Sequence, residues 1–119
     1  MKRKINGDLI SVIDDSSNVI LTIKVTIDET AVTIAAAGSI THDAAPDFED
    51  ELMSILTSKR DIVIDFSALE YISAPALQAL LSVQKLVDDK RYKFYIQNLS
   101  DSVKSIFENT GFIDLIEIH

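Results

Sequence analysis

Hydrophobic and polar residues alternate along the first third of the chain. Between Val19 and Ile27 every second residue is aliphatic, and threonine and lysine occupy several of the positions between them. A period of two with many β-branched residues predicts a strand. A second strand is expected over residues 31–35, after a turn at residues 28–30. These two strands should form an antiparallel hairpin.

Farther along the chain the apolar residues change to helical spacing in three segments. The first helix follows an expected loop at residues 38–43, and acidic residues crowd its first turns, where the helix dipole favours negative charge. The second helix is expected at about residues 75–89. The third begins at Ser100, which can cap it, and stops at Gly111. The three apolar stripes consist of Phe48, Leu52, Ile55 and Leu56; Leu77, Leu80 and Leu81; and Val103, Ile106 and Phe107.

Short apolar runs separate these helices and predict strands at residues 61–65, 93–96 and 115–118. The order is therefore two strands, then helix, strand, helix, strand, helix and strand. Right-handed crossovers make the later strands parallel, with the helices packed on the sheet. We predict an α/β fold: a single domain with a mixed β-sheet of about four to six strands and about three to four helices.

Residues 1–18 are interpreted as an N-terminal extension to a domain that spans residues 19–119. Apolar residues between positions 9 and 13 favour a short extra strand within the extension, followed by a turn at residues 14–18. The extension can pair in the sheet, cover an edge or bind a partner. The basic run at residues 2–4 is expected to be a solvated terminus.

The composition is globular, with 47% hydrophobic and 25% charged residues in a chain of 119. A net charge of -8 argues against nucleic acid and against an anionic membrane surface. No apolar run approaches the roughly 20 residues that span a bilayer, and no secretory signal is visible. We therefore expect a cytoplasmic protein without direct membrane insertion.

Catalytic and metal-binding chemistry is not indicated by the residue types present. The chain lacks cysteine and has two histidines, His42 and His119, without ligand spacing, so neither a metal nor a cofactor is expected. The three glycines form no phosphate-binding loop. Because no nucleophile is paired with a base, we expect a protein that is not an enzyme.

The segment from Asp61 to Leu81 carries most of the functional information. An apolar strand leads into a connection at residues 66–75, and Pro75 stands near the start of the helix, where a missing N–H costs little. Ligands and partners usually dock at the carboxyl ends of strands in open α/β sheets. The loop at residues 38–43 should lie beside this connection. Ser73 either caps the helix with its hydroxyl or accepts a phosphoryl group.

This segment resembles the signature of STAS domains, the family of bacterial anti-sigma factor antagonists and of the cytoplasmic domain of sulfate transporters. Members typically read as an apolar strand ending in Asp-Leu-Ser, followed by Ile-Asp-Ser-Ser-Gly-Leu at the start of a helix. Here the corresponding runs are Asp65-Phe66-Ser67 and Ile72-Ser73-Ala74-Pro75-Ala76-Leu77. The resemblance covers about residues 19–119 and implies a STAS-like fold.

The resemblance also implies a degenerate phosphorylation motif. In antagonists of the family, the first serine of the motif is phosphorylated by the partner kinase, and this serine falls on Ala74. An alanine has no oxygen to accept a phosphoryl group. The usual phosphorylation switch is therefore expected to be lost at this position.

The function implied by the resemblance is that of a non-enzymatic signalling adaptor, which binds an anti-sigma factor kinase or a chemotaxis protein. Two alternatives are a structural subunit of a membrane transport complex and a small-molecule sensor that uses the two loops. A homodimer is a further possibility. The expected partner-binding residues are Ser39, Thr41, His42, Ser73, Ala74, Pro75 and Gln78.

Overall fold

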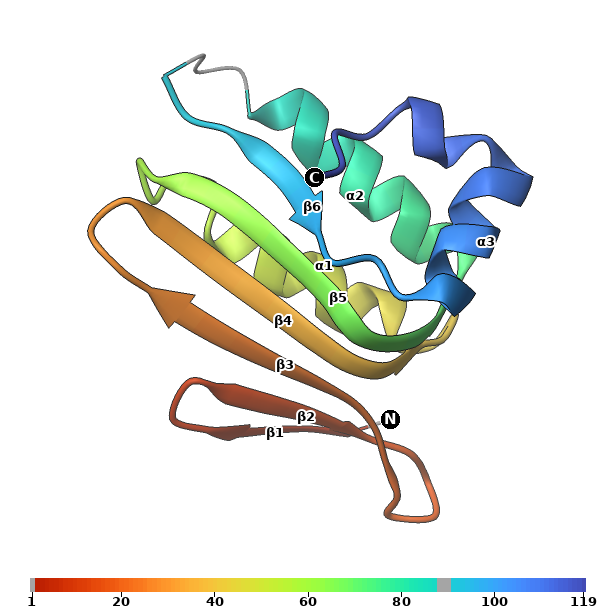
Figure 1. Cartoon of the computed structure of the whole chain (residues 1–119). Coiled ribbons are helices and arrows are strands. Elements are labelled where there is room, and N and C mark those ends of the chain that lie inside the picture. Colours follow the sequence, from red (N-terminus) through yellow and green to blue (C-terminus); the bar gives the residue numbers. More distant parts are fainter. Residues whose placement is uncertain (1, 88–90) are drawn as a thin grey trace.

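The computed structural model describes residues 2–87 and 91–119, which form a mixed β-sheet with helices packed against it (Figure 1). The strands are β1 (Lys2–Asn6), β2 (Leu9–Ile13), β3 (Val19–Ile27), β4 (Ala31–Ile40), β5 (Asp61–Ile72) and β6 (Phe94–Gln97). The helices are α1 (Ala45–Ser54), α2 (Ala74–Leu86) and α3 (Asp101–Thr110), followed by the short 3-10 helix η1 (Phe112–Asp114). The predicted α/β fold with a mixed sheet is confirmed.

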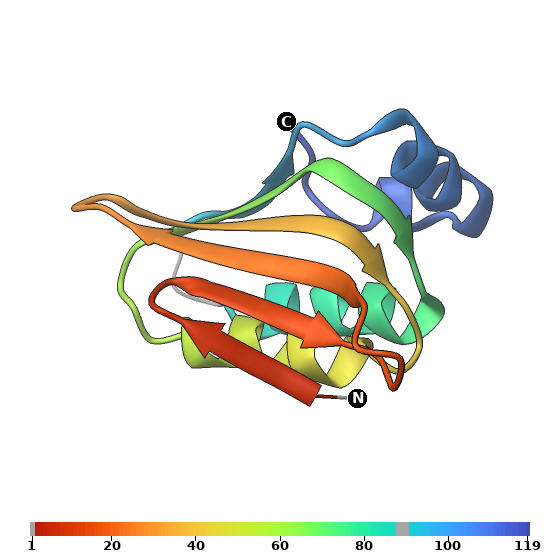
Figure 2. The same cartoon turned by 90° about the horizontal axis from the view of Figure 1, so that it is seen from below.

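Within the described residues the strands lie in the sheet in chain order, from β1 at one edge to β6. Strands β1 to β4 are antiparallel neighbours, whereas β4, β5 and β6 run parallel. Figure 2 shows α1 and α2 below the sheet and α3 above it, beside the second half of β5. Because β4 leads into α1 and β5 leads into α2, the carboxyl ends of these two parallel strands lie at the starts of the two helices.

The predicted antiparallel hairpin is confirmed as β3 and β4, and an aspartate forms its turn. The Asp28 carboxylate accepts hydrogen bonds from the backbone N–H groups of Thr30 and Ala31, both at 2.8 Å. These hydrogen bonds lower the pKa of Asp28 below its ordinary value. Asp28 is an acceptor that organises the turn locally, which is why the sequence alone indicated it.

The N-terminal extension contains two strands, so the interpretation of a short extra strand was incomplete. β1 pairs with β2, and the register joins Arg3 to Val12 and Ile5 to Ile10. Val12 and Ile10 are buried in the core. Because β2 in turn pairs with β3, the extension enlarges the sheet instead of remaining outside the domain.

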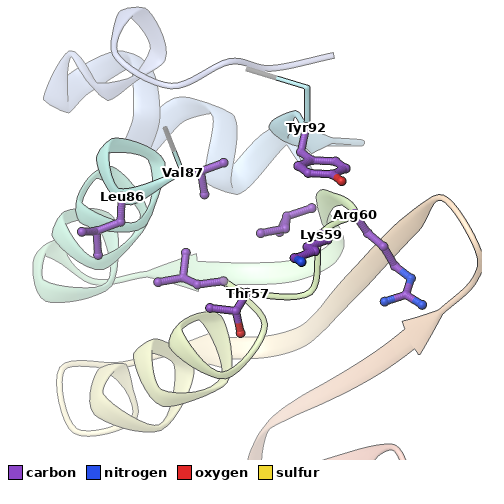
Figure 3. Close-up of a pocket in the computed structure, with 8 residues that line it drawn as sticks. Thr57, Lys59, Arg60, Leu86, Val87 and Tyr92 are labelled. Atoms are coloured by element: carbon purple, nitrogen blue, oxygen red, sulfur yellow. The ribbon is translucent and has the colours of Figure 1, made fainter. Parts of the chain in front are cut away.

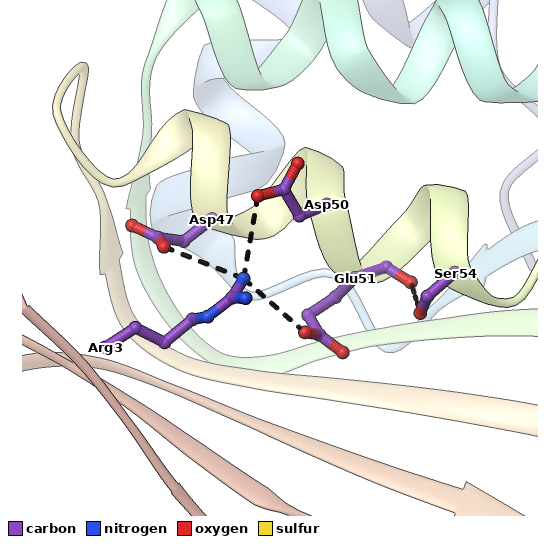
Figure 4. A network of polar contacts seen from close by, with 5 residues as sticks. All are labelled: Arg3, Asp47, Asp50, Glu51 and Ser54. Atoms are coloured by element: carbon purple, nitrogen blue, oxygen red, sulfur yellow. Dashed lines mark hydrogen bonds and ion pairs between the residues drawn. The ribbon is translucent and has the colours of Figure 1, made fainter.

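The basic run at the N-terminus is not merely a solvated terminus, because Arg3 faces α1 (Figure 4). Its guanidinium lies 3.7, 3.6 and 3.7 Å from carboxylate oxygens of Asp47, Asp50 and Glu51. Burial raises the pKa of Glu51, and the positive charge of Arg3 opposes that rise. Alternation along β1 determines which residues share a face with Arg3. The pairing of β1 with β2 then determines that this face is the one toward α1.

Residues 38–40 of the first predicted loop and residues 66–72 of the second are strand, which corrects two boundaries. β4 continues to Ile40 and β5 to Ile72, and these two residues are register partners. The register shifts between Ala35 and Ala37 and again between Gly38 and Ser39. Such irregularities break the period-two pattern, so the sequence signal stops before the strands do.

The remaining boundaries were predicted with mixed success. Ser100 caps α3, accepting a hydrogen bond from the N–H of Val103 at 3.3 Å, and Gly111 ends the helix with φ +81°. The strand expected at residues 115–118 is reduced to one parallel bridge, between Ile96 and Ile118. The second helix ends at Leu86, and residues 88 and 89 of its predicted range lie outside the described residues.

Candidate functional site

The carboxyl ends of β4 and β5 meet beside the first turns of α1 and α2. The backbone N–H of Ser73 donates to the carbonyl of Ile40 at 2.9 Å, which joins the start of α2 to the end of β4. The two segments that the sequence placed side by side are therefore neighbours. They are strand ends followed by short connections, which hold their side chains more rigidly than two loops would.

The expected partner-binding residues differ widely in exposure. His42, Ala74 and Gln78 are exposed, whereas Ser39, Thr41 and Pro75 are half-buried. Thr41 has a structural role, because its hydroxyl accepts a hydrogen bond from the N–H of Ala44 at 3.2 Å, at the start of α1. The exposed members define a surface at the carboxyl ends of β4 and β5, with Ala74 at the first residue of α2.

A groove of about 350 Å³ lies between the starts of α1 and α2. Two of the expected partner-binding residues, His42 and Pro75, line this groove. The other lining residues were not among those expected from the sequence; they are Asp43, Ala45, Pro46 and Glu49. The acidic residues were interpreted only as favourable charges at the start of a helix. Their place beside Pro75 depends on how α1 packs against α2, for which the sequence carries no direct signal.

Ser73 is the N-cap residue of α2, but the predicted capping hydrogen bond is absent. Its backbone is extended, with φ -83° and ψ 164°, and its carbonyl accepts from the N–H of Leu77. The residue is 4% exposed, and its hydroxyl has no hydrogen-bond partner among the described residues. Because this hydroxyl is buried, Ser73 is poorly placed to receive a phosphoryl group from another protein.

The aspartate of the motif has a structural role at the middle of β5. The Asp65 carboxylate accepts hydrogen bonds from the Ser67 N–H at 2.9 Å and from the side-chain amides of Asn98 at 3.2 Å and Gln97 at 3.4 Å. Burial by itself would raise the pKa of Asp65, but these hydrogen bonds outweigh it and lower the pKa below its ordinary value. Asp65 thus ties β5 to β6 and to the segment that leads into α3.

This arrangement predicts that Asp65 contributes to the loss of stability in acid. Because its pKa is lowered by folding, its contribution is present above the unfolded pKa and is lost as the pH falls through the folded value. The free energy of unfolding in urea, measured between about pH 6 and pH 2, should fall less steeply with decreasing pH for Asp65→Asn than for the wild type. A free energy of unfolding that declines as steeply for Asp65→Asn as for the wild type would contradict this role, and Asp8→Asn, at an exposed position outside the helices, is the matched control.

Neither a metal site nor a membrane-spanning helix is present in residues 2–87 and 91–119. No three histidine, aspartate or glutamate side chains of that part of the chain form a group that could hold a metal ion. No helix in the same ranges is both long and apolar enough to cross a membrane.

The chain matches the family described as STAS domain over residues 22–119. The matched range begins inside β3 and includes the whole of the parallel part of the sheet. It includes neither β1 nor β2. No curated protein sequence matches the chain.

Several solved structures share the fold. An anti-sigma factor antagonist from Mycobacterium paratuberculosis is similar with a TM-score of 0.75 and 17% identity, over 91% of this chain and 90% of that one. The anti-sigma factor antagonist SpoIIAA in its unphosphorylated form is similar with a TM-score of 0.67 and 14% identity, over 82% and 87% of the two chains. The murine anion transporter Slc26a9 is similar with a TM-score of 0.63 and 9% identity, over 95% of this chain and 20% of the transporter. At these identities the similarities establish the fold alone.

Proposed function

The chain belongs to the STAS domain family, and on that basis we propose that it is a non-enzymatic signalling adaptor of the anti-sigma factor antagonist type. It binds a protein partner through the exposed residues at the carboxyl ends of β4 and β5 and through the first turns of α2. An anti-sigma factor kinase or a chemotaxis protein is the proposed partner. The proposal places the protein in the cytoplasm.

The observation that carries this proposal is the exposed alanine at the first residue of α2. Ala74 occupies the position at which antagonists of the family carry the phosphorylated serine, and its methyl group cannot accept a phosphoryl group. In a phosphorylatable relative, a phosphate here would add about two negative charges to the docking surface. The chain therefore binds constitutively, or is regulated through its partner or its abundance.

The composition of the surface supports a protein partner. Ala74 and Pro75 present apolar atoms, His42 and Gln78 present polar groups, and the charges of Asp43 and Glu49 lie in the adjoining groove. Protein interfaces typically combine a core with few charges and a polar rim. Ser73 contributes through its backbone and its packing, since its side chain is buried.

A negative charge at Ala74 is expected to disrupt binding. We predict that Ala74→Glu weakens the affinity for the captured partner by about tenfold, because the charge must be desolvated in the interface. Folding should not suffer, since an acidic residue in the first turn of a helix is favourable. Ser82→Glu is the matched control, because it adds the same charge at an exposed position two turns farther along α2.

The experiment combines capture with affinity measurement. The tagged chain is purified from its native host, bound proteins are identified by mass spectrometry, and the affinity of each for the wild type and the two variants is measured by calorimetry. A soluble kinase or chemotaxis protein that is sensitive to Ala74→Glu alone supports the proposal. Equal affinity for all three chains contradicts the placement of the interface, and stoichiometric phosphate on the native protein contradicts the loss of the switch.

A second candidate function is that of a structural STAS subunit in a membrane transport complex. The specific observation in its favour is the fold shared with a part of the anion transporter Slc26a9, at a TM-score of 0.63. Cell fractionation separates the two candidates. Recovery of the chain with membranes, together with transporter subunits, would place this second function first.

A further inference from the structure

A pocket lies at the opposite end of the domain from the proposed docking surface. It opens between the carboxyl ends of α1 and α2, beside the amino end of β5 (Figure 3). Its volume is about 190 Å³. An engineered cavity of roughly 150 Å³ with an apolar lining is known to bind benzene, so the space suffices for a body slightly larger than one aromatic ring.

The walls of this pocket are aliphatic. Leu56 follows the end of α1, Ile62 lies in β5, and Leu86 and Val87 stand at the end of α2. Ile62 is 1% exposed and belongs to the core, whereas Leu86 is 55% exposed. A large aliphatic side chain that remains half in water beside a cavity gains from an apolar ligand that covers it.

The charged residues of the lining, Lys59 and Arg60, are both cationic. Lys59 lines the pocket together with Thr57, Arg60 and Tyr92. Figure 3 shows the guanidinium of Arg60 directed away from the pocket. Its Nε donates to the carbonyl of Asp28 at 2.8 Å, and one terminal nitrogen donates to the carbonyl of Ser58 at 3.0 Å.

The ammonium of Lys59, in contrast, has no ion-pair or hydrogen-bond partner among residues 2–87 and 91–119. Lys59 is exposed, and its backbone has φ +56°, which is uncommon for a residue other than glycine. No carboxylate side chain of the described residues lines the pocket. Within the described residues, the site therefore combines an aliphatic wall with one available positive charge.

We propose that this pocket binds a small monocarboxylate whose apolar body is about the size of a benzene ring. The body lies against Leu56, Ile62 and Leu86, and the carboxylate lies at the mouth beside the Lys59 ammonium. The partial negative charges at the carboxyl ends of α1 and α2 oppose an anion, so the affinity is modest. The proposal is independent of the partner-binding function, because the two sites use opposite ends of the parallel strands.

The test uses benzoate and benzyl alcohol as probes, which share a ring but differ in charge. The full chain, labelled with nitrogen-15, is titrated with each probe while its amide resonances are recorded. We expect saturable shifts at Thr57, Ile62 and Leu86, with dissociation constants in the millimolar range. Benzoate should bind about three- to fivefold more tightly than the alcohol, since an exposed ion pair contributes little more.

Two variants separate the charge from the apolar wall. Lys59→Met should remove the preference for benzoate while leaving the affinity for benzyl alcohol unchanged. Leu86→Ser should lower the affinity for both probes. Lys24→Met, at an exposed position of β3, is the control and should leave both affinities unchanged. Absence of saturable shifts, shifts confined to other residues, or a preference that survives in Lys59→Met would each overturn the proposal.

Discussion

Phe66→Ala is expected to lower the free energy of unfolding by about 3–5 kcal/mol, the range typical of a buried phenylalanine truncated to alanine. Phe66 is fully buried in β5, and its ring centroid lies 6.1 Å from that of Phe48 in α1. Truncation leaves a cavity between the sheet and α1, which the packed elements cannot close completely. The loss is a large part of the stability of a typical domain.

Urea unfolding followed by circular dichroism measures this effect. Phe66→Leu is the matched control, because it preserves most of the volume and should cost less than about 1.5 kcal/mol. The slope of the free energy of unfolding against urea concentration should be the same in both variants as in the wild type. An unchanged slope would show that the substitutions alter only the stability. A loss for Phe66→Ala below that of Phe66→Leu would contradict the packing described for β5 and α1.

Gly38→Ala is expected to cost about 2–4 kcal/mol, from a strained backbone and an overpacked contact together. Gly38 lies within β4 at φ +102°, a conformation that side chains disfavour. A Cβ atom added there would clash with the backbone oxygen of Ile20 and lie 3.2 Å from the carbonyl carbon of the same residue. Backbone atoms paired in a sheet cannot move aside cheaply, so the strand itself must shift.

Gly7→Ala is the control that separates these two costs. Gly7 also has a positive φ, +62°, but no heavy atom lies within 4 Å of a Cβ added there. It should therefore lose only the backbone contribution, about 1–2 kcal/mol. Calorimetric melting of the two variants compares them directly. Equal destabilisation would mean that the approach of β3 to Gly38 contributes nothing.

The Gly38 result also bears on the proposed docking surface. The irregular register between Gly38 and Ser39 lies just before the point at which Ser73 bonds to the carbonyl of Ile40. A shift of β4 would move the connection that leads to His42 and α1. Partner affinity measured on Gly38→Ala should therefore fall together with stability.

Features that depend on neighbouring residues were predicted from the sequence. The alternation from Val19 to Ile27 gave β3, and Asp28 organises the turn through groups two and three residues away. Ser100 and Gly111 bound α3 in the same local manner. The resemblance to STAS domains, which rested on the motif from Asp65 to Leu77, is confirmed by the family match over residues 22–119.

Features that depend on partners distant in sequence were decided by the tertiary structure. β1 forms because it pairs with the edge of β2. Only in this register does the Arg3 guanidinium lie beside the carboxylates of α1. The final strand was predicted as a full element and is a single bridge. β5 runs to Ile72 because β4 supplies its hydrogen bonds, although the apolar run ends earlier.

The same distinction holds for the two sites. The sequence itself determined that the chain is an α/β domain of the STAS family, and it placed Ala74 at the start of a helix. The groove beside Pro75 and the pocket beside Lys59 each depend on the packing of α1 against α2. Periodicity shows which face of a helix is apolar, but it does not show which other face will cover it. The burial of the Ser73 hydroxyl could not be predicted from the sequence for the same physical reason. Solvent exposure depends on the packing of the whole domain, whereas the preference of serine for a helix N-cap depends on the local chain.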